Sequence, residues 1–511
     1  MSEETTEPGE TGKPNATGQP NATGKPNETG QPGQTAADQN VYDVIVIGGG
    51  AVGENLAQRV VKRGLSAILV ESELLGGECS YWACMPSKAL LRSGEALRAA
   101  RAVPGAAEAV NGQLDVPAVL ARRDAFTSHW DDSGQIEWAK NAGITVLRGS
   151  ARLDGTKRVV VQPTDESSPR VLEARHAVGV CVGSKAAMPP IPGLREARPW
   201  TSRDATSAKE APKRLAILGG GVVGCELAQA WSDLGSHVTL LEMADRLLPA
   251  LEAFAGEHVA KSLRAAGVEV RTSTAVRSVA RENDGPAILS TDADDVSADA
   301  FLVATGREPN TAAVGLETVG LEPGSWLDVD DSCRVTAVEG GWLYAAGDVN
   351  HRALFTHMGK YQARTCGDAI AARAHGEHAA PVAWSPYAAT ADHGAVPAVV
   401  FTDPQVATVG LTEEQARDTG VVVQAVEYDV GNVAGAALRA DGYTGHVKIV
   451  VDQERLVIVG FTAVGPEIGE LLHAATVAVV GEVPLPRLWH AVPAYPTVNE
   501  LWLRLLETYG M

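Results

Sequence analysis

A glycine-rich segment that occurs twice limits the folds open to this chain more than any other feature. Its first copy, Gly48-x-Gly50-x-x-Gly53, follows the apolar run YDVIVI and precedes a helical stretch over residues 54–64. Gly48 permits a tight turn, Gly50 lets a pyrophosphate approach the backbone, and Gly53 lets helix and strand pack closely. A second strand, SAILVE, ends at Glu71, whose carboxylate is placed to accept hydrogen bonds from ribose hydroxyls. The segment therefore predicts a βαβ unit that binds a dinucleotide.

The same pattern returns in residues 214–242, with glycines at Gly219, Gly221 and Gly224 and an acid at Glu242. A single cluster of this kind is also found in ordinary glycine-rich turns. Two copies in full strand–helix–strand context, each with an acid at the same offset, indicate a duplicated nucleotide-binding unit. An acid at position 242 would repel a 2′-phosphate, which favours NADH over NADPH at the second site and leaves NADP as an alternative.

The composition is typical of a soluble globular enzyme. The chain has 511 residues, 45% of them hydrophobic and 21% charged, and this length predicts three or four domains. The formal net charge of -20 argues against nucleic acid and anionic membranes as partners. No run approaches ~18 apolar residues and no signal-peptide pattern is present, so we expect a cytoplasmic protein without a membrane span. Residues 1–40 are rich in Gly, Pro, Asn and Thr and are predicted to be a disordered low-complexity tail.

Two neighbouring cysteines are the most informative residues for chemistry. Cys79 and Cys84 lie in the segment GGECSYWACMPSK, and a helical pattern follows them. Pro86 suits the first turn of that helix, which places Cys84 near a helix N-terminus, where the dipole favours a thiolate. We interpret the pair as a redox-active disulfide, and not as inert thiols or as a zinc site, which needs about four ligands; no metal is predicted. The other cysteines are scattered singly and are interpreted as small core residues: Cys181, Cys225, Cys333 and Cys366.

From about Ser385 the pattern changes. Alternating segments such as HVKIVVD and LVIVGFTAV predict an antiparallel sheet. Two helical stretches, GELLHAATVAVV and NELWLRLLETYG, are expected to flank that sheet.

The chain resembles the class I pyridine nucleotide-disulfide oxidoreductases, which include dihydrolipoyl dehydrogenase, glutathione reductase and mercuric reductase. Besides the cysteine segment, residues 301–310 (FLVATGREPN), 342–348 (WLYAAGD) and 401–410 (FTDPQVATVG) match family motifs in the family's order. The resemblance implies an α/β fold with two Rossmann-like FAD- and NAD-binding domains, and a C-terminal α+β dimerisation domain that forms a homodimer. The expected boundaries are 41–190 and 313–384 for the FAD domain, 191–312 for the NAD(P) domain and 385–511 for the dimerisation domain.

The resemblance also implies the order of electron flow. NADH would give a hydride to one face of the flavin, and electrons would pass to the disulfide on the other face. Cys84 would be the sulfur nearest the flavin, and Cys79 the sulfur that meets the substrate. Lys88 and Glu226 match a family ion pair close to flavin N5. Further residues would contact the cofactors, with Asp348 reaching the ribityl chain: Gly77, Gly306, Arg307, Gly347, Asp348 and His357.

The C-terminus departs from the family pattern. The disulfide reductases carry a His-Pro-Thr-x-x-Glu motif whose histidine, supplied by the partner subunit, acts as acid–base for the substrate thiol. Here Tyr495 stands in the histidine's place, with Pro496, Thr497 and Glu500 in register. A phenol with a pKa of ~10 cannot shuttle protons near neutral pH as an imidazole with a pKa of ~6.5 does. Glu500 is then expected only to accept a hydrogen bond from Tyr495, and His490 is interpreted as a partly buried histidine, with the role of substitute base as the alternative.

We therefore expect an enzyme that passes electrons from NADH through FAD and the cysteine pair to a quinone or another small acceptor. Dihydrolipoyl dehydrogenase is the next alternative, followed by mercuric-reductase-like metal reduction and by a redox sensor that turns over little. A tyrosine at this place is similar to mercuric reductases and to soluble transhydrogenases. However, the transhydrogenases lack the cysteine pair, and mercuric reductases carry a second, C-terminal pair, whereas this chain ends LETYGM.

Overall fold

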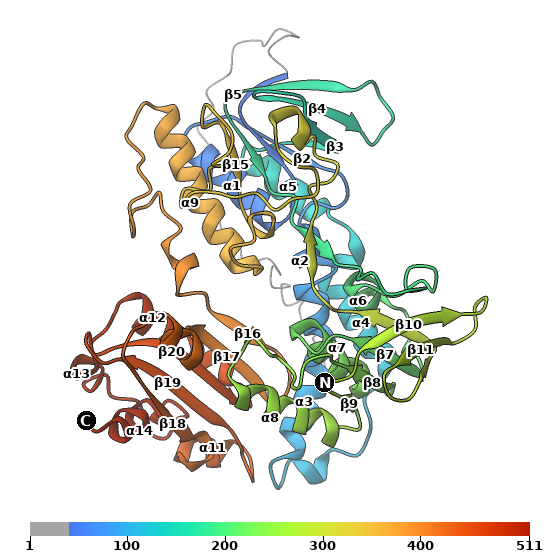
Figure 1. Cartoon of the computed structure of the whole chain (residues 1–511), viewed down its shortest axis with the longest axis vertical. Helices are drawn as coiled ribbons and strands as arrows, with labels where there is room; N and C mark the ends of the chain where they lie inside the picture. Colours follow the sequence, from blue (N-terminus) through green and yellow to red (C-terminus); the bar gives the residue numbers. More distant parts are fainter. Residues whose placement is uncertain (1–39) are drawn as a thin grey trace, which may run out of the picture.

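The first domain is built around a six-stranded sheet at the upper end of the molecule (Figure 1). The computed structural model describes residues 40–511, so the predicted tail lies outside the described residues except for position 40. Parallel pairing joins β3 to β2, β2 to β1, β1 to β5 and β5 to β15, while β4 pairs antiparallel with both β3 and β5. The strands are β1 (Val41–Ile47), β2 (Ala67–Glu71), β3 (Thr145–Leu153), β4 (Arg158–Pro163), β5 (Arg170–Val180) and β15 (Leu343–Ala345).

Two helices far apart in sequence lie side by side on this sheet (Figure 1). Arg59 of α1 (Ala51–Lys62) donates hydrogen bonds of 2.8 and 2.5 Å to Asp368 of α9 (Thr356–Ala374). This packing returns the chain to the first domain after the second one is complete, and it places the start of α9 near the first glycine turn. The remaining helices of the domain are α2 (Gly77–Tyr81), α3 (Cys84–Arg101), α4 (Val116–Phe126) and α5 (Ser133–Asn141).

The second glycine turn belongs to a four-stranded parallel sheet with the order β13-β7-β8-β9. A separate antiparallel sheet, β10-β11-β12, is inserted in the chain between β9 and β13, and the short antiparallel pair β6–β14 joins this domain to the first. The strands are β6 (Ser184–Ala186), β7 (Arg214–Leu218), β8 (His237–Leu241), β9 (Glu269–Arg271), β10 (Val276–Arg281), β11 (Ala287–Thr291), β12 (Val296–Ala298), β13 (Ala300–Val303) and β14 (Arg307–Pro309). The helices are α6 (Ser202–Ser207), α7 (Val222–Asp233) and α8 (Ala253–Ala265).

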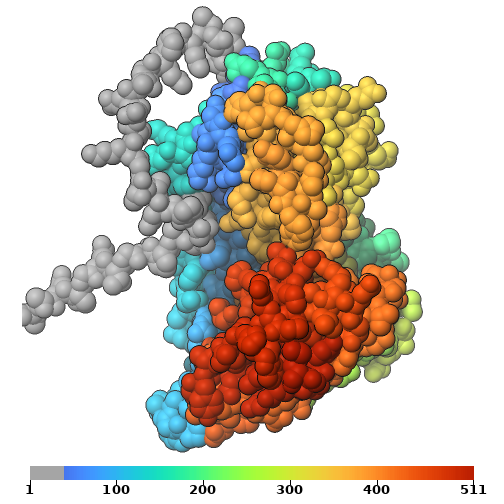
Figure 2. Space-filling view, turned by 90° about the vertical axis from the view of Figure 1, so that its left-hand side faces the viewer, coloured from blue at the N-terminus to red at the C-terminus, as the bar shows by residue number. Residues whose placement is uncertain are grey.

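The C-terminal part contains the predicted antiparallel sheet, with five strands in the order β16-β17-β20-β19-β18. Figure 2 shows it as one orange-red body below the orange residues of α9. The strands are β16 (Ala398–Val400), β17 (Gln405–Gly410), β18 (Val423–Asp429), β19 (His446–Asp452) and β20 (Val457–Gly465). The helices are α10 (Glu413–Asp418), α11 (Ala434–Arg439), α12 (Leu472–Val480), α13 (Leu485–Leu488) and α14 (Glu500–Tyr509).

The structure corrects one expected element boundary. Helix α1 begins at Ala51 and not at residue 54, because Gly50 is its N-cap and already accepts the N–H of Glu54 at 3.0 Å. Within the motif at residues 342–348, Leu343–Ala345 form strand β15. In the part of the chain that the structure describes, no helix is both long enough and apolar enough to cross a membrane.

Candidate active site

The first glycine turn has a shape that only glycine can adopt. Gly48 has a φ of +99°, and a Cβ there would lie 2.5 Å from the carbonyl oxygen of Cys181. A Cβ on Gly53 would lie 1.9 Å from the carbonyl oxygen of Gly48. On the far side of the turn, a Cβ on Gly77 would lie 2.8 Å from Cα of Gly50. Side chains cannot be accommodated at these positions, and Gly50 as the N-cap of α1 leaves a helix N-terminus that favours an anionic pyrophosphate.

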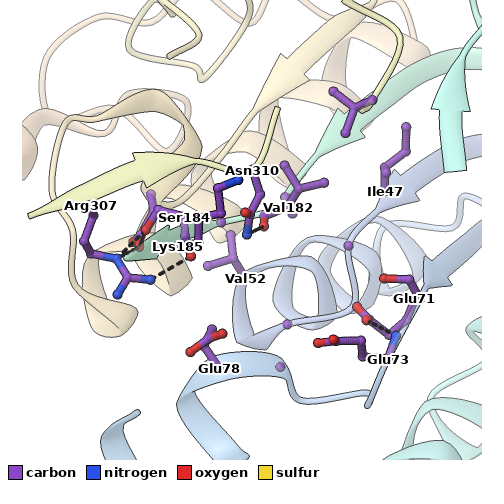
Figure 3. A pocket seen from close by; sticks show the side chains of 18 of the residues that line it. Ile47, Val52, Glu71, Glu73, Glu78, Val182, Ser184, Lys185, Arg307 and Asn310 are labelled. Carbon is purple, nitrogen blue, oxygen red and sulfur yellow. Dashed lines mark hydrogen bonds and ion pairs between the residues drawn. The ribbon is translucent and has the colours of Figure 1, made fainter. Parts of the chain in front are cut away.

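A cavity of about 710 Å³ lies against this turn (Figure 3). Glu71 borders one side of it, and Ser184 and Arg307 border the other. Cys79 and Thr356 also line the cavity. The glycine turn and the cysteine segment therefore share one cavity, whose volume suits a large organic ligand.

Asp348 is held at the cavity wall by two neighbours. The Ser184 hydroxyl donates a hydrogen bond of 2.5 Å to Asp348, and Arg307 Nε donates one of 2.6 Å to the Ser184 hydroxyl. The Arg307 guanidinium lies 3.7 Å from the Asp348 carboxylate. Gly347 and Gly306 have φ values of +84° and +145°, which glycine tolerates and other residues rarely adopt. The turns at Gly306 and Gly347 thus bring the Arg307 guanidinium and the Asp348 carboxylate to the same wall of the cavity.

The second glycine turn repeats the geometry of the first. Gly219 has a φ of +105°, and a Cβ on Gly224 would lie 1.9 Å from the carbonyl oxygen of Gly219. The position of a Cβ on Gly221 is open, with no atom within 4 Å. Glu242 accepts a hydrogen bond of 2.5 Å from the N–H of Gly220, so its carboxylate lies directly beside the turn. This arrangement suits a second dinucleotide.

The two cysteines are both free thiols, and their environments differ. Cys84 is the first residue of α3, and its sulfur lies 3.3 Å from the Thr356 hydroxyl. A hydrogen bond from the Cys79 thiol is the main cause that lowers the pKa of Cys84 to about 6, and Thr356 and the Lys88 charge lower it further against the effect of burial. The same bond, together with burial, raises the pKa of Cys79 well above its ordinary value. The pair is therefore poised as a thiolate at Cys84 and a thiol at Cys79.

Lys88 and Glu226 form the ion pair that the resemblance implies. Lys88 Nζ lies 2.6 Å from Glu226 Oε2, and the Glu226 side chain is only 4% exposed. Glu226 Oε1 accepts the N–H of Phe401 at 2.9 Å, and the Lys88 ammonium lies 4.8 Å from the Phe401 ring centroid. Glu226 is therefore a buried partner of Lys88 and not an exposed charge early in a helix.

The C-terminal candidates do not form the expected arrangement within the described chain. The Tyr495 side chain is 76% exposed, and no hydrogen bond joins it to Glu500 in residues 40–511. Glu500 is buried, and its Oε2 has no hydrogen-bond partner among the described residues. The interpretation of His490 as partly buried is wrong, because this side chain is exposed beyond the end of α13. His357 is also exposed, and its Nε2 lies 2.8 Å from the carbonyl oxygen of Pro397.

Several residues that the fold brings to the site were not predicted from the sequence. Thr356 contacts Cys84, and Ser184 bonds to Asp348. Arg203 of α6 forms an ion pair with Glu78, beside Cys79 in the chain, and its guanidinium lies 4.2 Å from the Trp82 ring centroid. Each contact joins segments that are far apart in sequence, so none of them has a local pattern.

Comparison with known families agrees with this geometry. Residues 42–376 match the family model of the pyridine nucleotide-disulphide oxidoreductases, and residues 396–505 match the model of the dimerisation domain of that family. The chain belongs to this family. It is therefore an FAD-dependent oxidoreductase that binds a nicotinamide nucleotide, and the predicted fold class, enzyme class and cofactors are confirmed. The dimerisation domain supports a homodimer.

Individual relatives differ in what they act on. The chain is 35% identical to a mercuric reductase from Shigella flexneri over 470 residues, which cover 89% of this chain and 79% of the relative. It is 31% identical to a dihydrolipoyl dehydrogenase from Haloferax volcanii over 479 residues, which cover 91% and 95%. Among solved structures, the Cu(II) complex of the HOCl-induced flavoprotein disulfide reductase RclA from Escherichia coli is similar, with a TM-score of 0.78, 25% identity and coverage of 92% and 99%.

Proposed function

We propose that this protein oxidises NADH and passes two electrons through FAD and the Cys84/Cys79 pair to a small acceptor such as a quinone. The observation that supports this most is the contrast between Cys84 and the cysteines elsewhere. The pKa of Cys84 is lowered to about 6, whereas burial raises the pKa of Cys181 to about 12 and also raises that of Cys225. A thiolate is the reactive form of cysteine, so Cys84, beside Cys79 of the cavity wall, is prepared for electron exchange.

The residues around the cavity fit FAD. In this proposal the turn at Gly48–Gly53 holds the pyrophosphate, Glu71 a ribose and Asp348 the ribityl chain. FAD, when bound, accepts a hydride from the nicotinamide and transfers two electrons to the disulfide. Lys88, fixed by Glu226, keeps a positive charge close enough to Cys84 to stabilise its thiolate.

NADH is the proposed electron donor because the second glycine turn presents negative charge to the ribose. The Glu242 carboxylate lies beside the turn, where it would repel a 2′-phosphate. We place the reaction in the cytoplasm, where NADH is available, and in a homodimer. The apolar side chains of Val477 and Val492, 53% and 85% exposed on the dimerisation domain, favour such an association.

The proposed acceptor is small and is not a dithiol substrate, because Tyr495 replaces the histidine that would manage the substrate's protons. The ordinary pKa values of the two side chains differ by ~3.5 units, which corresponds to roughly 5 kcal/mol in the cost of moving a proton. A quinone brings its own proton-accepting oxygens and needs no base from the C-terminus of the partner subunit.

A panel of acceptors tests this proposal. The purified flavoprotein is assayed with quinones, lipoamide, Hg(II), glutathione disulfide and oxygen, each with NADH and with NADPH. We expect the highest kcat/KM with a quinone and NADH. A higher value with lipoamide or Hg(II) would assign the chain to one of those activities instead. If NADH does not bleach the flavin under anaerobic conditions, the proposal that this protein oxidises NADH is refuted.

A further inference from the structure

One arginine contacts the cysteine segment both before and after Cys79 in the sequence. Arg203 of α6 forms an ion pair with Glu78, the residue directly before Cys79. Its guanidinium also lies 4.2 Å from the ring centroid of Trp82, where the cation faces the aromatic ring. Two hydrogen bonds of 2.9 and 3.2 Å from Arg203 to the Glu73 carboxylate fix the guanidinium further. Arg203 and Cys79 line the same cavity, so these contacts belong to the wall of the active site.

A second residue of α6 holds the same segment by its backbone. The Thr206 side chain is buried, and the shortest hydrogen bond of its hydroxyl, at 2.7 Å, goes to the carbonyl oxygen of Trp82. Thr206 and Arg203 are three positions apart and therefore lie on one face of the helix. Cys79 lies between Glu78 and Trp82 in the chain, so this face of α6 holds both ends of the stretch that carries the sulfur.

Helix α6 is itself fixed at both ends. Before it, Trp200 donates its N–H to the carbonyl oxygen of Phe301 in β13 at 2.7 Å, which ties the helix to the sheet of the nicotinamide domain. At its other end, the guanidinium of Arg123 donates hydrogen bonds of 2.5 and 2.9 Å to the carbonyl oxygens of Thr206 and Ala208. Arg123 is fully buried, and loss of these partners would leave buried charge without compensation. A helix held in this way can give the cysteine segment a fixed position.

We propose that Arg203 and Thr206 position Cys79 opposite Cys84 and thereby set the equilibrium between the disulfide and the dithiol. Arg203 is a positioning residue, because it acts on the sulfur through the contacts of residues 78–82. Two thiols on a fixed segment meet at a high effective concentration, which favours the disulfide, whereas a loose segment lowers that concentration and favours the dithiol. This inference rests on the proposed function, because it assumes that the pair passes between these two states.

The test follows an exchange between two thiol–disulfide couples, one of the protein and one of dithiothreitol. The S–S bond of Cys79 and Cys84 breaks, and the two sulfurs of dithiothreitol join. Two electrons and one proton pass to the protein, which keeps Cys84 as a thiolate and Cys79 as a thiol, and the second proton goes to water. Neither NADH nor a quinone takes part, so the result does not depend on the electron donor or on the acceptor.

The equilibrium constant of this exchange is the measured quantity. The holoenzyme is equilibrated anaerobically with mixtures of reduced and oxidised dithiothreitol, free thiols are trapped with iodoacetamide, and the Cys79 peptide is quantified by mass. Arg203→Met should shift the equilibrium toward the dithiol by at least about tenfold, or about 30 mV, because an ion pair and a cation–π contact are lost. Thr206→Val should shift it in the same direction by about threefold, since one hydrogen bond is lost. Arg203→Lys keeps the charge without the planar guanidinium and should fall between the wild type and Arg203→Met.

The matched control removes the same kinds of contact away from the cysteines. Lys209 Nζ lies 3.4 Å from Asp124 and 4.2 Å from the ring centroid of Trp130, so Lys209→Met should keep the wild-type equilibrium constant. The thiolate–flavin band of the two-electron-reduced enzyme reports Cys84 and the flavin, and it should remain in Arg203→Met. An equilibrium constant of Arg203→Met within about a factor of two of the wild type, a shift toward the disulfide, or an equal shift in Lys209→Met would overturn the inference.

Two further outcomes stay decisive. If Arg203→Met does not retain FAD, Arg203→Lys and Thr206→Val carry the test, and unchanged equilibrium constants in both would overturn the inference. If NADH does not bleach the flavin of the wild type, the proposed function fails, whereas the exchange with dithiothreitol still measures how Arg203 and Thr206 act on the cysteine pair.

Discussion

The two glycine-rich units have nearly the same backbone and different surroundings. In each unit, a Cβ on the third glycine would lie 1.9 Å from the carbonyl oxygen of the first. The acid that ends the second strand accepts a hydrogen bond from the second residue of the turn in both, at 2.6 Å for Glu71 and 2.5 Å for Glu242. This agreement in detail is what a duplicated binding unit requires, since each turn must receive the pyrophosphate of its own dinucleotide.

The difference begins at the residue after the third glycine. In the first unit it is Glu54, a buried carboxyl beside the cysteine segment, and in the second it is Cys225, a buried thiol whose pKa is raised. The start of α7 is also open, with Val222 and Val223 36% and 37% exposed, whereas α1 is covered by α9. The glycines thus select the class of ligand, and the neighbouring residue and the covering helix decide which chemistry takes place there.

Substitution of the third glycine should have the largest effect and should separate the two units. Gly53→Ala is expected to abolish FAD binding, because its Cβ meets a backbone carbonyl oxygen that cannot move away. Gly224→Ala should leave the flavin bound and abolish its reduction by NADH. Flavin absorbance of the purified variants and anaerobic titration with NADH check both expectations. Retention of stoichiometric FAD by the Gly53 variant would contradict the assignment of the first unit.

Removal of the second acid should change the choice of nucleotide without affecting the flavin. Glu242→Ala is expected to reduce the preference for NADH over NADPH, measured as the ratio of kcat/KM values, by about tenfold. Tenfold corresponds to ~1.4 kcal/mol, which lies between the repulsion of two unit charges ~4 Å apart in water (~1 kcal/mol) and near a protein surface (~4 kcal/mol). The matched control is Asp245→Ala, which removes an exposed carboxylate from the same loop. An equal change in both variants would point to net charge instead of the position of Glu242.

The ion pair of Lys88 with Glu226, which joins the two units, should set the pH at which the Cys84 thiolate forms. In the two-electron-reduced enzyme, the long-wavelength thiolate–flavin band should be present at neutral pH and disappear as the pH falls through about 6. Lys88→Met removes a positive charge that favours the thiolate and should raise this midpoint by about 1 unit. Cys84→Ser should abolish the band at every pH. A band that survives this last substitution would mean that Cys79 is the sulfur nearest the flavin.

The smallest effect is expected for Glu54→Gln on the melting temperature of the protein. The pKa of Glu54 is raised from 4.5 to about 8, which means that the folded state favours the neutral carboxyl. Its contribution to stability is complete at pH values below the unfolded pKa and is lost as the pH rises through about 8. Glu54→Gln should therefore match the wild-type melting temperature near pH 5 and exceed it by a few degrees near pH 9. The same comparison for Glu257→Gln, which removes an exposed carboxylate from α8, should show no trend with pH.

Local patterns explain most of what the sequence predicted. The glycine turns, the helix that begins at Cys84 and the C-terminal antiparallel sheet follow from short-range spacing and alternation. The ion pair of Lys88 with Glu226 came from the family resemblance, and the structure contains it. The burial of Glu54 is different, because a charged residue in the first turn of a helix is normally solvated, and only tertiary packing leaves this side chain 3% exposed. The contact of Cys84 with Thr356 spans 272 positions and leaves no trace in local sequence.

Helix α7 does more than present the second glycine turn. Glu226 and Gln229, one turn apart, accept the N–H groups of Phe401 and Asp403 at 2.9 and 2.8 Å, and Glu226 also holds Lys88. One edge of the nicotinamide domain is thereby fixed to the flavin domain and to the segment that leads into the dimerisation sheet. Ser262 and Glu252, at helix α8 on the same domain, also bond to the C-terminal part, to the carbonyl oxygen of Asp403 and to Lys448. The segment from Phe401 to Asp403 therefore takes its position from the nicotinamide domain before its chain enters the C-terminal sheet.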